Sequence, residues 1–389
     1  GVKAQSSSAG AARPQGERAS RGMKAVLLIG NFSGSLRPLT LSQPLPLLRF
    51  CNRSLIFHQL QALKDAGISQ VVICHPNKEV PADWTAAIEQ LSGELGLKLV
   101  CSQETEPAGT AGALKHAEAL VTDDGTNDAP FIVVNADVLC SYPLRDLLLA
   151  HLKHGREGTL LTTRSEEPSE YGVVVVDERT GGITHFVDRP ETFVSDRINC
   201  GVYVFSPAIF ERIRASSRVS MNELLPAMAK AEQLNSMLLS GYWVKLTSTR
   251  SYMGAVASHL EIARYLAPAS LAESTADFTV TGNVMVHPSA TIGKGCVVGP
   301  AVVIGPNCRV AEGVRLESCT LLEGAAVASH AIIRESVLGL GSSIGRWCFV
   351  NGSVLGEAVE VCEALLLNGA TVLPQKQLER NIRSPEIVI

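Results

Sequence analysis

The chain has 389 residues, enough for two domains with sizeable hydrophobic cores. Its net charge of -4 argues against the basic surface that nucleic-acid-binding proteins use, so we exclude nucleic acid as the main partner. No apolar run approaches the roughly 18 residues needed to span a bilayer, so we expect a soluble protein without a membrane partner.

The cysteines and histidines show no catalytic or metal-binding pattern. None of the ten cysteines forms a C-x-x-C pair, which argues against a zinc site. Most lie in apolar runs, so we expect buried free thiols and a reducing compartment. His116, His185 and His330 lack an acidic or serine partner at motif spacing, so a catalytic triad is not supported.

The two ends of the chain differ from the rest. Residues 1–22 are rich in Ala, Ser, Gly and Arg and carry no apolar periodicity, which indicates a flexible or targeting extension. We expect a cytoplasmic protein, and import into an organelle through residues 1–22 stays open. Residues 376–389 are mildly basic and are predicted to be a solvated C-terminal tail.

The segment 23–265 alternates short apolar runs with helix-length stretches. This pattern predicts an α/β domain with a mostly parallel sheet, because strands buried on both faces read as continuous apolar runs. The predicted strands are 24–29, 70–74, 98–101, 131–134, 172–177 and 201–205, and the predicted helices are 55–66, 84–95, 111–120 and 221–231.

The segment 275–375 follows a period of six residues instead. Such a period over more than seventy residues is the hexapeptide signature of a parallel β-helix whose aliphatic side chains point into each coil. The aliphatic positions are Val280, Val286, Ile292, Val298, Ile304, Val310, Leu316 and Leu322, and after a phase shift Ile332, Leu338, Ile344 and Val350.

The loop after the first predicted strand, residues 30–47, is the first place to look for a ligand. Ligands of open parallel sheets bind beyond the carboxyl ends of the strands. The loop contains Gly30, Gly34 and one basic residue, Arg37. Without further information it is either a weak phosphate-binding loop or a plain connection.

This loop resembles the signature G-G-x-G-T-R-L-R-P-L-T followed by S-K-P-K-P-L of the sugar nucleotidyltransferases. The resemblance is greatest to the mannose-1-phosphate guanylyltransferases (GDP-mannose pyrophosphorylases) of the β type. It extends over residues 23–389 and includes segments 109–112, 171–175, 186–190, 199–201 and 241–243. It implies that the β-helix is left-handed and often mediates oligomerisation. It also implies transfer of GMP from GTP to mannose 1-phosphate with release of pyrophosphate.

The family positions that handle the triphosphate and the metal are substituted. Two glycines of the signature become Asn31 and Ser33, its arginine becomes Ser35, and its two lysines become Gln43 and Leu45. Asp137 stands where the family has a metal-binding aspartate, whereas the second aspartate becomes Lys245, which would repel Mg²⁺. Loss of one preorganised contact costs about 10²–10³ in rate, so little turnover should remain.

The family positions that hold sugar and base are better kept. Retained ligand binding and a purely structural role, with glycines for turns and Asn199 for a strand-end hydrogen bond, are equally compatible with them. The candidate substrate-binding residues are Gly30, Arg37, Gly109, Gly112, Gly172, Asp188, Arg189 and Asn199.

Two functions remain open. In the first, the chain is a catalytically inactive homologue without a cofactor. It would act as a structural or regulatory subunit of a homo- or hetero-oligomer, either with an active pyrophosphorylase or within a larger complex, and a nucleotide sugar is its candidate ligand. In the second, it is an active, Mg²⁺-dependent mannose-1-phosphate guanylyltransferase.

Overall fold

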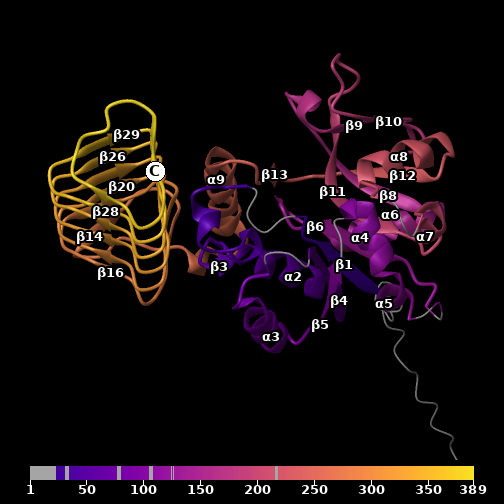
Figure 1. Cartoon of the computed structure of the whole chain (residues 1–389), viewed down its shortest axis with the longest axis horizontal. Helices are drawn as coiled ribbons and strands as arrows, with labels where there is room; N and C mark the ends of the chain where they lie inside the picture. Colours follow the sequence, from indigo (N-terminus) through magenta and orange to yellow (C-terminus); the bar gives the residue numbers. More distant parts are fainter. Residues whose placement is uncertain are drawn as a thin grey trace, which may run out of the picture.

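The structure, a computed structural model, describes residues 23–30, 35–76, 80–104, 108–123, 125, 127–214 and 218–389. The predicted extension 1–22 and the substituted loop positions Asn31 and Ser33 lie outside these residues. An α/β domain occupies one end of the molecule and a stack of short strands the other, with α9 (Thr249–Leu266) between them (Figure 1).

The α/β domain is built on one nine-stranded sheet, with strand order β10-β9-β11-β6-β1-β4-β5 and with β8 pairing β11 and β12. The run β5-β4-β1-β6 is parallel, and β11 continues it in the antiparallel direction. The strands are β1 (Lys24–Leu28), β4 (Gln70–Pro76), β5 (Lys98–Glu104), β6 (Phe131–Asn135), β8 (Gly158–Arg164), β9 (Gly172–Val176), β10 (Ile183–Asp188), β11 (Arg197–Phe205) and β12 (Leu234–Leu238).

Helices cover both faces of this sheet. Ala25 and Leu27 of β1 pack on one face with α2, α3 and α6, while Val26 and Leu28 pack on the other with α4, α5, α7 and α8. This confirms the predicted α/β domain. The predicted helix 111–120 is in fact two short helices that meet at Ala117. The helices are α2 (Leu55–Asp65), α3 (Trp84–Leu95), α4 (Gly109–His116), α5 (Glu118–Thr122), α6 (Leu144–His154), α7 (Ile209–Arg212) and α8 (Met221–Lys230).

The second domain is a left-handed parallel β-helix of three parallel sheets, as predicted. The first sheet contains β14 (Phe278–Val280), β17 (Cys296–Val298), β20 (Arg315–Glu317), β23 (Ile332–Arg334), β26 (Phe349–Asn351) and β29 (Leu366–Asn368). The second contains β15 (Val284–Val286), β18 (Val302–Ile304), β21 (Thr320–Leu321), β24 (Val337–Leu338), β27 (Val354–Leu355), β30 (Ala370–Val372) and β32 (Glu386–Val388). The third contains β16 (Thr291–Ile292), β19 (Arg309–Val310), β22 (Ala326–Val327), β25 (Ser343–Ile344), β28 (Glu360–Val361) and β31 (Gln377–Leu378).

The coils of the β-helix change length, which corrects the predicted phase. Val298 pairs with Leu316, 18 residues on, but Leu316 pairs with Ile333, only 17 residues on. One side of each later coil is therefore a residue shorter. As a result Leu321 and Ile333 face the β-helix core, and the prediction that Leu322 and Ile332 point inward is wrong.

The predicted tail 376–389 is the last coil of the β-helix. Its two strands β31 and β32 pair with β28 and β30. Leu378 and Ile382 are buried against the β-helix core, because they continue its aliphatic pattern. Within this segment, Arg380 forms an ion pair with Glu386. The prediction of a separate solvated tail was therefore wrong.

Packing joins the two domains around α9. Tyr252 of α9 is fully buried, and its hydroxyl donates to the carbonyl of Arg49, 2.6 Å away. Arg49 belongs to a tight hairpin of β2 (Arg49–Phe50) and β3 (Arg53–Ser54), and its guanidinium donates to Glu323 of the β-helix at 2.8 and 3.0 Å. We call the buried side chains around this contact the junction cluster; it includes Leu36, Leu39, Leu45, Leu48, Phe50, Leu139, Leu246, Tyr252, Val303, Leu322 and Val337.

The cysteines are free, and eight of the ten are buried, as the sequence predicted. Among the described residues, none of the helices combines the length and hydropathy required to cross a bilayer.

Candidate functional site

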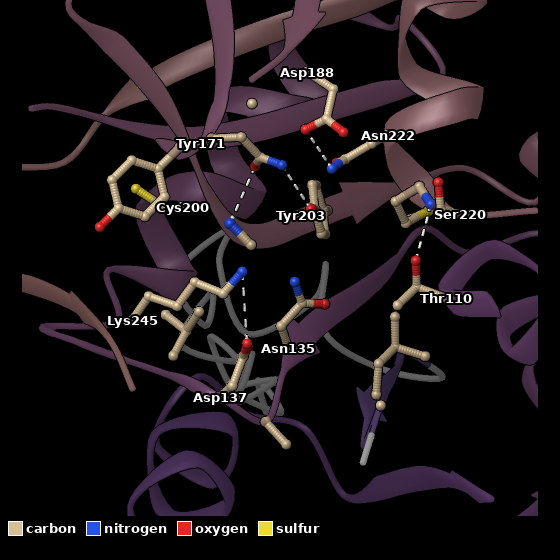
Figure 2. Close-up of a pocket in the computed structure, with 18 of the residues that line it drawn as sticks. Thr110, Asn135, Asp137, Tyr171, Asp188, Cys200, Tyr203, Ser220, Asn222 and Lys245 are labelled. Atoms are coloured by element: carbon tan, nitrogen blue, oxygen red, sulfur yellow. Dashed lines mark hydrogen bonds and ion pairs between the residues drawn. The ribbon is translucent and has the colours of Figure 1, made fainter. Parts of the chain in front are cut away.

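A cavity of about 360 Å³ lies beyond the carboxyl ends of β1 and β6, where a parallel sheet binds its ligands (Figure 2). Its walls come from the loop after β1, the turn after β6, the β9 and β10 strands, and the start of α8. Its polar lining comprises Ser35, Thr110, Asn135, Asp137, Glu170, Tyr171, Asp188, Arg189, Asn199, Tyr203, Ser220, Asn222, Trp243 and Lys245.

Asp137 and Lys245 point toward one another across this cavity (Figure 2). Asp137 lies in the turn between β6 and β7 (Val138–Cys140), and Lys245 ends β13 (Trp243–Lys245), which pairs with β7. The Lys245 Nζ is 3.7 Å from Oδ2 of Asp137, and the amide of Leu246 donates to the Asp137 carbonyl at 2.8 Å. Burial raises the pKa of the Asp137 carboxyl, and the Lys245 ammonium opposes this rise.

A buried side chain holds the Asp137 turn in place. The Nε2 group of Gln59 in α2 donates to the carbonyls of Asn135, Ala136 and Val138 at 3.0–3.3 Å. Gln59 is fully buried, so the turn has little freedom to move. The backbone of Asp137 is therefore held in position beside β13.

The residues present do not fit the Mg²⁺ ion that the family resemblance implies. A cation bound to Asp137 would lie against the Lys245 ammonium, and like charges repel. Mg²⁺ also prefers an octahedron of oxygen ligands that usually includes one or two carboxylates. In the part of the chain that the structure describes, no three Asp, Glu, His or Cys side chains cluster suitably for a metal.

The phosphate-loop positions present little positive charge to the cavity. Ser35 and Leu45 line it, but neither carries a charge. Leu45, 5% exposed, is a member of the junction cluster, so its apolar side chain fits its surroundings. Arg37 is exposed, and neither it nor Gln43 is part of the lining.

Among the predicted sugar-side residues, Gly30, Gly172, Asp188, Arg189 and Asn199 line the cavity. Gly30 has open space around it, so a ligand can approach its backbone closely. Nδ2 of Asn222 donates to Oδ1 of Asp188 at 2.8 Å (Figure 2). Arg189 has a positive φ of 43°, and its amide donates to the Tyr171 carbonyl.

Two of these residues also serve the fold. Asn199 donates from Nδ2 to the hydroxyl of buried Tyr203 at 2.8 Å, and its Oδ1 accepts from the Gly201 amide at 3.1 Å. A Cβ on Gly172 would lie 2.5 Å from the Phe186 ring. Both residues therefore have a structural role, although Gly172 makes room for the Phe186 ring and does not serve a turn, and both also line the cavity.

Gly109 and Gly112 are not in the lining. Gly109 adopts a φ of +73°, and a Cβ there would meet the Val219 carbonyl at 2.6 Å. The Gly112 amide donates to the same carbonyl at 3.2 Å. These two glycines anchor the start of α4 against the segment before α8, and thereby place their neighbour Thr110 in the cavity wall.

Sequence reasoning missed Asn135, Glu170, Ser220 and Asn222. Oδ1 of Asn135 is buried and has no hydrogen-bond partner among the described residues, so this polar atom is available to a ligand. Its place at the end of β6, two residues before Asp137, could have revealed it. Asn222 reaches the cavity only because α8 packs across β10, and no local pattern signals that contact.

The chain is similar to known proteins along most of its length. Residues 24–261 match the family described as nucleotidyl transferase, and residues 280–388 match the GMPPB C-terminal domain. The zebrafish (Danio rerio) protein named mannose-1-phosphate guanylyltransferase catalytic subunit beta is 42% identical over 369 residues, which cover 94% of this chain and 100% of the relative. The Arabidopsis thaliana mannose-1-phosphate guanylyltransferase 1 is 41% identical with the same coverage.

A solved structure also shares the fold. A Bacillus anthracis protein named as a glucose-1-phosphate thymidylyltransferase superposes with a TM-score of 0.52. The superposition covers 60% of this chain and 93% of that one, at 19% identity.

Proposed function

Since the chain belongs to the mannose-1-phosphate guanylyltransferase family of nucleotidyltransferases, we propose that it is a catalytically inactive member of that family. The observation that carries the proposal is the Lys245 ammonium beside Asp137, in the part of the cavity where a metal ion would have to bind. No cofactor is required in this proposal.

The chemistry of the family explains why this matters. Nucleotidyl transfer displaces pyrophosphate from the α-phosphorus, and negative charge builds on the leaving group. Catalysis therefore depends on cations that are already in place when the charge develops. With Ser35 and Leu45 in the phosphate loop, the described lining offers Arg189 and Lys245 as its cations. The Lys245 ammonium already forms an ion pair with Asp137, and it cannot bridge two phosphates as a divalent metal does.

The retained sugar side supports a binding role without turnover. Asn135, Asp188, Asn199 and Asn222 present polar groups to the cavity, and Gly30 leaves room beside β1. Such a lining suits a polyhydroxylated ligand, and a nucleotide sugar is the candidate. The zebrafish relative is named a catalytic subunit, so that protein works in an assembly. We propose that this chain is a structural or regulatory subunit of such an assembly, in contact with its own copies or with an active homologue.

Pyrophosphate release tests the catalytic half of the proposal. The purified chain is incubated with GTP, mannose 1-phosphate and Mg²⁺, with the Arabidopsis relative as the active control. We expect no release above background. Turnover within about tenfold of the control would instead establish the alternative, an active guanylyltransferase, because that is less than the loss expected from one missing contact.

A restored variant sharpens the result. Ser35→Arg, Leu45→Lys and Lys245→Asp together return the family residues, and release should rise above that of the wild type. Circular dichroism must first show that the variant is folded, because Leu45 is buried. Lys245→Arg is the matched control, because it keeps the positive charge and should stay inactive.

Calorimetric titration with GDP-mannose tests the binding half. We expect binding of equal affinity with EDTA and with Mg²⁺, because no metal takes part. Asp188→Ala should weaken it. Absence of binding at millimolar GDP-mannose would remove the ligand from the proposal and leave a purely structural subunit.

A further inference from the structure

A second, larger cavity of about 740 Å³ lies where the β2–β3 hairpin, the C-terminal half of α9 and the first coils of the β-helix meet. It is separate from the cavity at Asp137, with which it shares no lining residue. Among the described residues, its lining contains two arginines and three histidines and no aspartate or glutamate. Each arginine forms an ion pair with a glutamate outside the lining, so the cavity offers hydrogen-bond donors and no carboxylate that would repel an anion.

Its wall contains an imidazole without a hydrogen-bond partner. Neither ring nitrogen of His259 makes a hydrogen bond to any residue that the structure describes. Its ring packs edge-to-face on the rings of Phe50 and His58, with distances between ring centres of 5.3 and 5.2 Å. Burial lowers the pKa of His259. The ring nitrogens of His259 are therefore available to a ligand in the cavity.

The other two histidines have assigned tautomers. Nε2 of His58 donates to the Phe50 carbonyl at 2.9 Å, and burial lowers the pKa of His58 to about 4, so its ring is neutral. Nδ1 of His287 accepts from the Ser289 amide at 3.2 Å, so the N–H donor of this ring is Nε2. His287 is therefore a hydrogen-bond donor on the β-helix side.

The positive charge comes from the hairpin. Arg53 donates to Glu94 through Nη1 at 2.6 Å, and its guanidinium lies 4.7 Å from the centre of the Phe57 ring. Its Nε and Nη2 make no hydrogen bond to the described residues, and these are the two donors that a guanidinium offers as a fork to an oxyanion. The neighbouring Arg49 is already bound to Glu323, so Arg53 is the better anchor.

The lining also contains apolar side chains. They are Ile262, Ala263 and Leu266 near the end of α9, the helix that carries His259, and Met285 and Pro288 on either side of His287 in the first β-helix coil. Leu266 is 81% exposed, although large aliphatic side chains are usually buried. A cavity lined by both hydrogen-bond donors and apolar side chains suits a ligand with a charged head and an apolar body.

We propose that this second cavity, which we call the junction cavity, binds an organic phosphate. The phosphate lies against Arg53 and His259, and the apolar body of the ligand packs against Leu266 and Met285. Phosphate is favoured because it fits the guanidinium fork and accepts from several donors at once. The site does not depend on whether the chain is an enzyme.

The two walls of this cavity continue directly into the first one. The hairpin begins four residues after Leu45, and α9 begins four residues after Lys245. Leu45 and Lys245 both line the cavity at Asp137. The segments that line the two cavities are therefore neighbours along the chain.

Phenyl phosphate is the probe, because it joins a phosphate to one apolar ring. It is titrated into the full chain by calorimetry, with inorganic phosphate and phenol titrated separately as its two halves. We expect saturable binding of phenyl phosphate and weaker binding of each half. Arg53→Ala should weaken the binding of phenyl phosphate about tenfold, because the loss of a hydrogen bond to a charged group usually costs about that much.

Two further variants test whether the ligand binds in this cavity. Arg164→Ala is the matched control, because Arg164 also forms an exposed ion pair, with Asp196, but is not part of this cavity. It should leave the affinity unchanged. Glu94→Gln releases Arg53 from its ion pair and should tighten binding about twofold.

His259→Phe tests the imidazole without leaving a hole, and thermal unfolding shows whether the variant is folded. It should weaken binding as Arg53→Ala does. Equal affinities in the wild type, Arg53→Ala and His259→Phe would overturn the proposal. So would binding that is weakened as much by Arg164→Ala as by Arg53→Ala.

Discussion

Replacing Lys245 by aspartate should convert the ion pair at Asp137 into a metal-binding pair of carboxylates. In the wild type the Lys245 ammonium is 3.7 Å from Asp137, and the two side chains are 37% and 35% exposed. Lys245→Asp removes that cation and adds a second carboxylate on β13, which is paired in register with β7 beside Asp137. Two carboxylates and no competing cation are an adequate core for Mg²⁺.

The size of the effect follows from the geometry. Two charges about 4 Å apart interact by about 4 kcal/mol at an effective dielectric constant near 20, but partial exposure reduces this to about 1 kcal/mol. We therefore expect the metal-free variant to lose about 1 kcal/mol of unfolding free energy. Bound Mg²⁺ at about 100 times its Kd should return about 2.7 kcal/mol, a rise in Tm of roughly 3 °C for a chain of 389 residues.

The pH dependence has a defined sign. Burial already raises the pKa of Asp137 in the folded protein, and the variant lacks the ammonium that opposed this rise. A carboxyl whose folded pKa lies above its unfolded value stabilises the protein when protonated and loses that contribution as the pH rises through the folded pKa. The metal-free variant should therefore regain stability as the solution is made acidic.

Thermal unfolding in EDTA and in MgCl₂ measures these changes for the wild type, Lys245→Asp and Lys245→Asn. The wild type should show no Mg²⁺-dependent rise in Tm, the aspartate variant a clear one, and the asparagine control a small one. An equal rise in the wild type and Lys245→Asp would refute the reasoning, because Lys245 would then not prevent metal binding.

Three further predictions concern stability. Ile333→Ala should lower the unfolding free energy by about 3 kcal/mol because it leaves a hole at a buried core position, whereas Ile332→Ala should lower it by less than about 1 kcal/mol. Equal losses of the two variants in denaturant unfolding would contradict the 17-residue coil. Burial lowers the pKa of His151 to about 4, so the roughly 3 kcal/mol that its neutral ring contributes to the unfolding free energy should be present above pH 6.5 and lost between pH 6.5 and 4. In a plot of unfolding free energy against pH, His151→Gln should reduce the loss in this acid range. Tyr252→Phe should lower the unfolding free energy by about 1 kcal/mol, and no change would mean that its buried hydroxyl bond is not stabilising.

Local pattern was sufficient for the strands and helices of the α/β domain. β1, β4 and β6 are continuous apolar runs because helices cover both faces of their sheet, and such runs are visible without any structure. The repeat of six was equally visible, since each of the three sides of a coil places one aliphatic side chain in the β-helix core. Its phase was not, because a single shorter side per coil is set by packing: Leu322 serves α9 rather than the β-helix core.

The sequence by itself also placed Ser35, Leu45 and Lys245 at positions where the family it resembles has arginine, lysine and aspartate, and this is the basis for the prediction that the triphosphate side lacks those groups. Only the tertiary structure decided what replaced them. Lys245 meets Asp137 through the pairing of β13 with β7, more than 100 residues apart in sequence, and Leu45 is buried among side chains of α9 and the β-helix. The junction cavity, in which the His259 imidazole has no hydrogen-bond partner among the described residues, likewise exists only where three distant segments meet. Residue type determines what a side chain can do, but burial and neighbours determine what it does, and these depend on contacts that are long-range in sequence.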